Sequence, residues 1–198
     1  MKYIYSYMRE AKQLIGNIDL NQIKKMIDLL VNLRKQEGRL FILGVGGGAG
    51  HASHAVNDFR KICGIEAYTP TDNVSELTAR VNDDGWETSY VNWLKISMLK
   101  SNDMIFIFSV GGGNLEKKVS VNIIKSIQFA EKIGAKICGV VGMDGGYTAK
   151  VADACIIIPP INPKTITPHT EEFQAVIWHL LVSHPELQKN EMKWESIK

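Results

Sequence analysis

The sequence predicts an α/β protein, a three-layer α/β/α sandwich around a parallel sheet of five strands. Short apolar runs alternate with segments long enough to be helices, which is the pattern of βαβ units. Most of these runs are almost continuously apolar, as expected for strands covered on both faces. At 198 residues the chain is long enough for one domain with a sizeable core.

Two helices precede this alternation, and we expect them to form an N-terminal helical hairpin over residues 1–37. The first covers about residues 3–15 and the second residues 19–36, where apolar side chains recur at helical spacing. Asp19 and Gln22 offer a capping box at the start of the second helix. The apolar faces of both helices need a covering surface, for which a partner subunit is one candidate.

The α/β core is expected over residues 38–185, followed by a polar tail over residues 186–198. Its predicted strands are residues 40–43, 66–68, 104–108, 136–141 and 154–158, and its predicted helices are residues 50–62, 74–81, 86–99, 117–133, 146–152 and 169–183. Right-handed crossovers then give a doubly wound sheet. In such sheets ligands bind beyond the carboxyl ends of the strands, so the loops there are the first place to look for a site.

Composition and charge exclude several classes of partner. A formal net charge of +2 gives no basic surface for nucleic acid, and the longest apolar run, residues 104–108, is too short for a bilayer. The N-terminus lacks the pattern of a secretory signal. Cys63, Cys138 and Cys155 form no CxxC pair and are interpreted as reduced thiols. We therefore predict a cytoplasmic protein.

Two glycine-rich loops follow predicted strands, at residues 44–50 and 109–114. Glycine lets backbone N–H groups approach an anion closely, and a helix N-terminus adds partial positive charge. A small phosphorylated ligand is the favoured interpretation, although tight turns without a ligand remain an alternative. A dinucleotide is less favoured, because the first loop has a lone GxGxxA pattern and no acidic residue closes the second strand. We expect no redox or nucleotide cofactor.

Polar residues on the helices supply the candidate chemistry. His54 and Asp58 are four residues apart and share one helix face, where they suit acid–base work, metal binding or a solvated surface. His179 stands in an apolar run and needs a partner, which in many proteins is a backbone carbonyl. Glu171 lies two turns earlier, about 12 Å along the helix. Asn82 and Asp83 form a polar turn, which either contributes to a site or is an ordinary surface turn.

At these positions the chain resembles the sugar isomerase (SIS) domain family, and within it the phosphoheptose isomerases, over about residues 20–185. The matched segments are Val45-Gly46-Gly47-Gly48 for a loop Asn-Gly-Gly-Ser, His54 and Asp58 for His-x-x-x-Glu, Asn82-Asp83 for an Asn-Asp turn, residues 109–114 for a loop Ser-Thr-Ser-Gly-Asn-Ser, Asp144-Gly145-Gly146 for Asp-Gly-Gly, and Glu171 with His179 for Gln-x7-His. The agreement in spacing across these segments is more specific than any single motif.

The resemblance implies a SIS fold with flavodoxin-like winding and a homotetramer whose active sites lie at subunit boundaries. It implies isomerisation of D-sedoheptulose 7-phosphate to D-glycero-D-manno-heptose 7-phosphate, for capsule or lipopolysaccharide synthesis, with Asp58 as base and His179 as acid. The implied substrate-binding residues are Gly46, Gly47, Gly48, Asn82, Asp83, Ser109, Val110, Gly111, Asn114 and Glu171. A zinc ion would be bound by His54, Asp58, Glu171 and His179.

Several departures keep alternatives open. Val45, Gly48, Val110 and Gly111 lack side chains that would hydrogen-bond substrate in the commoner enzymes, and about six extra residues follow Asn114. The carboxylates also differ, since the family's Glu is Asp58 here and its Gln is Glu171. One alternative is a non-catalytic SIS module that binds a sugar phosphate or a partner protein as a regulator. Another is an isomerase of a different ketose phosphate.

Overall fold

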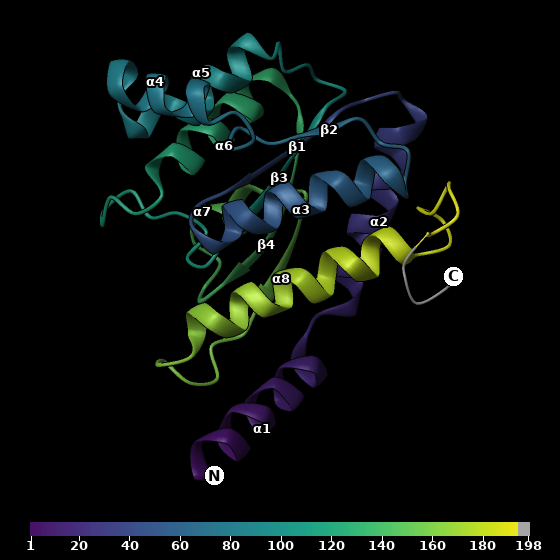
Figure 1. The fold of residues 1–198 in the computed structure, drawn as a ribbon, viewed down its shortest axis with the longest axis vertical. Coiled ribbons are helices and arrows are strands. Elements are labelled where there is room, and N and C mark those ends of the chain that lie inside the picture. The colour runs from purple at the N-terminus through teal and green to yellow at the C-terminus, as the bar shows by residue number, and fades with distance from the viewer. Residues whose placement is uncertain (194–198) are drawn as a thin grey trace.

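The computed structural model describes residues 1–193. At its centre is a parallel sheet with the strand order β2-β1-β3-β4-β5 (Figure 1). The strands are β1 (Leu40–Gly44), β2 (Ala67–Tyr68), β3 (Met104–Ser109), β4 (Lys136–Gly142) and β5 (Ala154–Ile158). This order is the flavodoxin-like winding. The predicted five-stranded sheet and its winding are thus confirmed.

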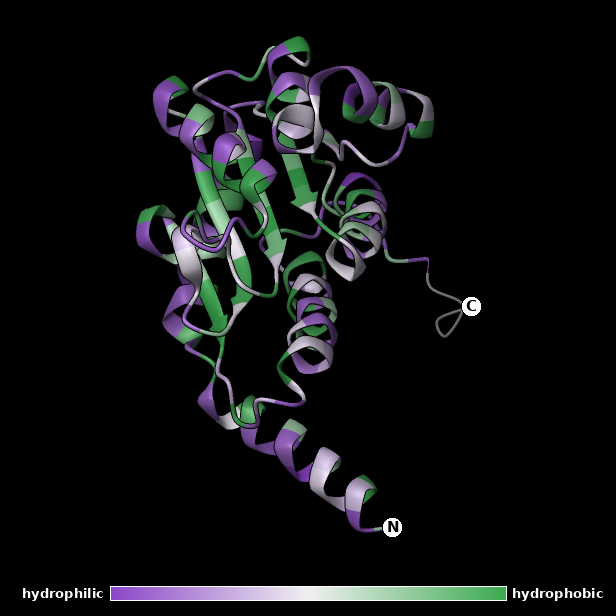
Figure 2. Cartoon of the chain, turned by 90° about the vertical axis from the view of Figure 1, so that its left-hand side faces the viewer, coloured by the Kyte–Doolittle hydropathy of each residue, from purple (hydrophilic) through white to green (hydrophobic). Residues whose placement is uncertain are grey.

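Helices cover both faces of the sheet, as the alternation of elements predicts. They are α1 (Lys2–Asn17), α2 (Leu20–Lys35), α3 (Gly47–Lys61), α4 (Val74–Asp84), α5 (Trp86–Ile96), α6 (Val121–Ile133), α7 (Gly146–Val151) and α8 (Ile166–Ser183). One buried apolar cluster joins α2, α3 and α8 to the sheet, and a second joins α5 and α6 to the other face. The strands between them are strongly hydrophobic (Figure 2).

The register of the central strands brings the two glycine-rich loops together. Gly44 at the end of β1 pairs with Phe108 near the end of β3. A Cβ on Gly48, just after the first loop's turn, would lie 2.6 Å from the carbonyl oxygen of Phe108. The first loop therefore lies directly on the end of β3, where the second loop begins.

The predicted N-terminal hairpin is wrong, although both of its helices form. Helix α1 leads away from the body instead of folding back on α2 (Figures 1 and 2). Its connection to α2 passes through Ile18 in an extended conformation, and Asp19 then starts the second helix as its N-cap. Only Glu10 and Leu14 of α1 are buried. Tyr7 and Ala11 are half-buried, whereas Tyr3, Ile4, Tyr5, Met8 and Ile15 are exposed.

The predicted capping box is half formed. The Asp19 carboxylate accepts hydrogen bonds from the backbone N–H groups of Asn21 and Gln22. The Gln22 side chain does not return to the cap but accepts from the backbone N–H of Cys155 on the edge strand β5 (3.1 Å). This contact ties α2 to the sheet.

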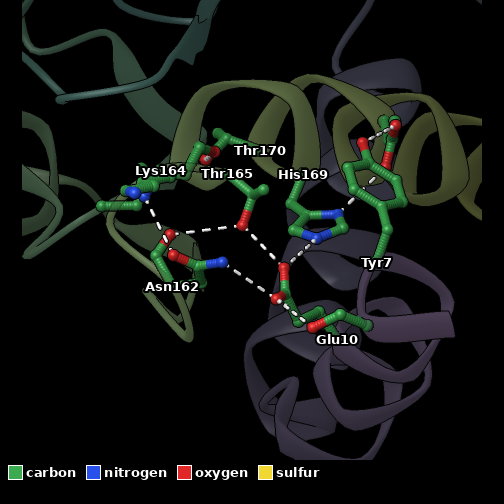
Figure 3. Close-up of polar contacts among 10 residues, drawn as sticks. Tyr7, Glu10, Asn162, Lys164, Thr165, His169 and Thr170 are labelled. Atoms are coloured by element: carbon green, nitrogen blue, oxygen red, sulfur yellow. Dashed lines mark hydrogen bonds and ion pairs between the residues drawn. The ribbon is translucent and has the colours of Figure 1, made fainter. Parts of the chain in front are cut away.

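A buried carboxylate fastens α1 to the start of α8 (Figure 3). Glu10 accepts hydrogen bonds from Asn162 Nδ2 (2.9 Å) and Thr165 Oγ1 (2.7 Å), and its Oε2 lies 3.1 Å from Nε2 of His169. The bonds from Asn162 and Thr165, with a smaller contribution from His169, lower the pKa of Glu10 to about 2. Glu10 is therefore a carboxylate at neutral pH.

The same cluster continues across His169 to Tyr7 (Figure 3). His169 is buried, and its Nδ1 lies 3.1 Å from Oε2 of Glu172. The hydroxyl of Tyr7 donates to the other oxygen of Glu172, and the Tyr7 ring lies over the imidazole with centroids 4.3 Å apart. Desolvation and the bond to Glu172 raise the pKa of Tyr7 to about 12. With Glu10 at Nε2 and Glu172 at Nδ1, both ring nitrogens of His169 face carboxylates.

Two other boundaries differ from the sequence prediction. Helix α6 begins at Val121, because residues 115–120 form a turn closed by an antiparallel bridge between Asn114 and Val119. The predicted tail is docked at its start, since Arg34 donates to the carbonyls of Glu186 and Leu187, and Leu187 is buried. Residues 194–198 of that tail lie outside the described residues. No helix within residues 1–193 is long and apolar enough to cross a membrane.

Candidate functional site

The first glycine-rich loop opens to the surface at the N-terminus of α3. Gly46 has φ 61° and ψ −124°, a conformation that requires glycine, and a Cβ there would meet nothing within 4 Å. A Cβ on Gly47 would instead lie about 2.5 Å from the carboxylate oxygens of Glu171. Glu171 therefore lies against this loop, at the positive end of α3.

The second loop is held by the loop that follows β4. Ser109 Oγ accepts from the N–H of Gly112 (3.1 Å), and the Gly112 carbonyl accepts from both the N–H and the hydroxyl of Thr148. Gly112 has φ 64°, and a Cβ on it would lie 1.9 Å from the carbonyl oxygen of Gly145. The Asp144-Gly145-Gly146 motif thus provides the close backbone contact that supports the second loop.

Other residues of the second loop have distinct surroundings. The Val110 carbonyl accepts from the N–H of Gly142 (2.9 Å), whereas a Cβ on Gly111 would meet only Met143 Sδ, at 3.7 Å. The Asn114 side chain accepts from the N–H of Lys117 (2.8 Å) and so caps its own turn. Gly111 is therefore the open side of this loop.

Three candidate residues come together where α3 and α8 pack. Oδ2 of Asp58 lies 3.5 Å from Nε2 of His54 and 3.7 Å from Nε2 of His179. The carboxylate is buried, with a side chain 8% exposed, while the two imidazoles are 56% and 43% exposed. A pocket of about 410 Å³ opens onto them, lined also by Asn57 and Lys61. The sequence prediction that His54 and Asp58 share a face holds, and α8 adds His179.

Hydrogen bonds orient each member of this His–Asp–His cluster. Oδ2 of Asp58 accepts from the indole N–H of Trp178 (3.2 Å), and Oδ1 accepts from Nδ2 of Asn57 (3.1 Å). Nδ1 of His179 lies 2.9 Å from the carbonyl oxygen of Ala175. Since that carbonyl can only accept, Nδ1 carries a proton, and a neutral ring then presents the Nε2 lone pair toward Asp58. Sequence reasoning missed Trp178, because a tryptophan in an apolar run is normally a core residue.

The cluster suits a divalent metal ion. Its two imidazole nitrogens and one carboxylate oxygen all lie within 4.8 Å of one another. These are ligand types that zinc accepts, and the bond from His179 Nδ1 to a carbonyl is the usual support for a metal-binding histidine. Glu171, the fourth predicted ligand, is absent from this group within the described residues, because it lies beside Gly47.

Asn82 and Asp83 are placed elsewhere. Both are exposed near the end of α4, where Asn82 Nδ2 donates to Asp83 Oδ1 (2.8 Å). Helix α4 has no buried residue at all. No hydrogen bond or ion pair within residues 1–193 joins these two side chains to the His–Asp–His cluster.

Proteins of known identity resemble this chain in sequence and in fold. No protein-family model matches the chain. A probable phosphoheptose isomerase of Thermoplasma volcanium is 28% identical over 182 residues, covering 89% of this chain and 87% of the relative. A phosphoheptose isomerase of Helicobacter pylori is 28% identical over 162 residues, covering 78% of each.

The solved structure of a phosphoheptose isomerase from Neisseria gonorrhoeae has the same fold. It superposes with a TM-score of 0.78 at 21% identity, over 91% of this chain and 96% of that one. The chain therefore shares the fold of that enzyme and is similar in sequence to phosphoheptose isomerases over most of its length.

Proposed function

We propose that the protein is an aldose–ketose isomerase that converts D-sedoheptulose 7-phosphate to D-glycero-D-manno-heptose 7-phosphate. The observation that carries this proposal is the His–Asp–His cluster, a buried carboxylate between two half-exposed imidazoles in an open pocket, in a chain related to phosphoheptose isomerases. The product would supply heptose for capsule or lipopolysaccharide synthesis in the cytoplasm.

The chemistry needs a base and a group that moves protons between oxygens. Asp58 removes a proton from C1 of the open-chain ketose, which gives a cis-enediol, and returns a proton to C2. His179, through Nε2, takes the proton of the C1 hydroxyl and delivers one to the oxygen on C2. No electron acceptor takes part, since C1 is oxidised as C2 is reduced. General acid–base catalysis of this kind contributes about 10²–10⁴-fold.

A zinc ion fits the same cluster, with His54, Asp58 and His179 as its ligands. It is the alternative to proton transfer by His179, because the Nε2 lone pair cannot bind a metal and accept a proton at once. When bound, zinc would polarise the substrate carbonyl and stabilise negative charge on the oxygens. Zinc stoichiometry in purified protein separates the two roles. About one zinc per chain in the wild type and a clear loss in His54→Ala would support the metal site, whereas equal metal content in both proteins would contradict it.

Helix geometry favours active sites shared between subunits. Gly47 begins α3 and Asp58 follows eleven residues later, which is about 16 Å along the helix. An extended seven-carbon sugar phosphate spans only about 10 Å from C1 to phosphorus. One substrate therefore cannot easily have its phosphate at residues 46–48 and its C1 at Asp58 of the same chain. The exposed apolar side chains of α1, such as Tyr3, Ile4 and Met8, offer a surface for a homotetramer.

Mixing two inactive variants tests the shared site. Asp58→Asn removes the base, and Gly111→Asp puts a negative charge on the open side of the second loop. If the two groups of one site come from different subunits, mixed tetramers regain up to about a quarter of wild-type activity. Light scattering checks the tetramer. No recovery in verified mixed tetramers would show that each site lies within one chain.

The activity itself is tested with the purified protein and a panel of ketose phosphates. We expect sedoheptulose 7-phosphate to raise the melting temperature and to be converted to the aldose, as followed by NMR of the product. Stabilisation by the sugar phosphate without conversion would favour the non-catalytic module, which the absence of hydroxyls at Val110 and Gly111 also favours. Faster conversion of another ketose phosphate would identify a different isomerase.

A further inference from the structure

We infer that Trp178 is a positioning residue of this isomerase, which fixes the carboxylate of Asp58 and the imidazoles beside it. The inference rests on the proposed function, because the role concerns that reaction. Trp178 does not exchange protons itself, since an indole N–H only donates a hydrogen bond. It acts through Asp58.

The hydrogen bond to Asp58 is formed away from water. Trp178 is 2% exposed and Asp58 is 6% exposed, and Nε1 lies 3.2 Å from Oδ2. The same oxygen faces Nε2 of His54 and of His179. The indole therefore holds the oxygen that meets both imidazoles, and Asp58 itself lines the pocket.

The ring of Trp178 also contacts three histidines. Its centroid lies 5.0 Å from that of His51, 5.3 Å from that of His54 and 4.7 Å from that of His179. The pair with His54 is edge-to-face, at an interplanar angle of 61°. Aromatic rings at such distances prefer defined relative orientations, so moving the indole would shift both imidazoles of the cluster.

A chain of contacts anchors Trp178 to the sheet. Gln174 Nε2 donates to the carbonyl of Val140 on β4 (3.2 Å), and Gln174 Oε1 lies 3.2 Å from Nδ1 of His51. His51 then lies beside the indole, and Phe108 of β3 packs on it with centroids 5.9 Å apart. The sheet thus fixes the position of the indole, and the indole fixes the orientation of the Asp58 carboxylate.

The terminal torsion of an aspartate is broad, so without the indole N–H the carboxylate is free to rotate. Replacing Trp178 with Phe keeps an apolar ring and removes the donor. We expect kcat to fall about 10–100-fold, the equivalent of losing one hydrogen bond to a charged group. KM should change less than about threefold, because the glycine-rich loops that hold the phosphate are untouched.

The experiment compares kcat and KM of wild type, Trp178→Phe and Leu181→Val, all well below their melting temperatures. Leu181→Val is the matched control, a buried residue three positions further along α8 that has no hydrogen bond to the cluster. A lower kcat in Trp178→Phe with wild-type kcat in Leu181→Val supports the inference. Unchanged kcat in Trp178→Phe, or an equal loss in both variants, overturns it. A wild type without turnover overturns the proposed function and this inference together.

An NMR measurement tests the contact independently of activity. The indole N–H signal of Trp178 is the one that disappears in Trp178→Phe. In the wild type we expect it to exchange slowly with solvent, and in folded Asp58→Asn to shift by more than any other indole signal. A Trp178 signal that exchanges rapidly, or that does not move in Asp58→Asn, would overturn the inference.

Discussion

Helix α8 carries a histidine–carboxylate cluster at each end. The two clusters differ in whether the imidazole nitrogens already have a partner within hydrogen-bond distance. At the N-terminal end, His169 is buried and both of its ring nitrogens face carboxylates, those of Glu10 and Glu172, at 3.1 Å. At the other end, His179 is 43% exposed, and its Nε2 is 3.7 Å from Asp58, beyond hydrogen-bond distance.

This difference indicates that the cluster at His169 anchors α1, whereas the cluster at Asp58 is available for chemistry. At the first cluster, the buried imidazole has a carboxylate at each ring nitrogen, which stabilises one arrangement of α1 on α8 and leaves neither nitrogen for a ligand. The cluster around Asp58 has its carboxylate fixed by Trp178 and Asn57, but keeps two imidazole nitrogens directed at one oxygen beside an open pocket. We therefore expect substitutions at the first cluster to affect stability and those at the second to affect turnover.

The largest effect is expected for Asp58→Asn. Asparagine keeps an oxygen that accepts from Trp178 but cannot serve as a base, so kcat should fall by about 10²–10⁴-fold. The melting temperature should change little. Steady-state kinetics and thermal denaturation check both statements, with the exposed Asp28→Asn on α2 as control. Near-normal kcat in Asp58→Asn would remove Asp58 from the mechanism.

The converse result is expected for His169→Ala. Removing the buried imidazole takes one polar partner from each of Glu10 and Glu172 and leaves a cavity, which should lower the melting temperature by roughly 4–12 °C. At 25 °C, and at a concentration where the oligomer is intact, kcat should stay within threefold of wild type. A loss of turnover as large as that of Asp58→Asn would mean that the two ends of α8 are not separable.

Acid should weaken the anchoring cluster specifically. The pKa of Glu10 is lowered from 4.5 to about 2 by the bonds from Asn162 and Thr165, so its contribution to stability is fully present above pH 4.5 and lost as pH falls toward 2. The difference in melting temperature between wild type and Glu10→Gln should be constant above about pH 5 and shrink below it. A difference that does not depend on pH would contradict this assignment.

The smallest effect is expected for Tyr7→Phe, which removes one exposed hydrogen bond to Glu172 and keeps the ring over His169. We expect a stability loss of about 1 kcal/mol at neutral pH. Because the pKa of Tyr7 is raised to about 12, this contribution persists below pH 10 and disappears as pH rises through 12. Chemical denaturation of both proteins at pH 7 and pH 11 measures the difference in their free energy of unfolding. A larger difference at pH 11 than at pH 7 would contradict this prediction.

Local patterns predicted the sheet, the two glycine-rich loops and the pairing of His54 with Asp58, because each depends on residues close in the chain. The rest depends on distant contacts. Glu10 and His169 are 159 residues apart, and Trp178 meets Asp58 across 120 residues. Helical spacing puts Glu171 about 12 Å from His179, but only the packing of α8 on α3 places it beside Gly47. The spacing of residues along the sequence does not predict such contacts.

The most direct test of the account is isomerisation of sedoheptulose 7-phosphate in heavy water. Asp58 and His179 are proposed to move protons, so a proton removed from C1 can exchange with solvent before one is returned to C2. We expect product with deuterium at C2, formed by the wild type and lost in Asp58→Asn. Product that forms at the wild-type rate without any deuterium at C2 would contradict it.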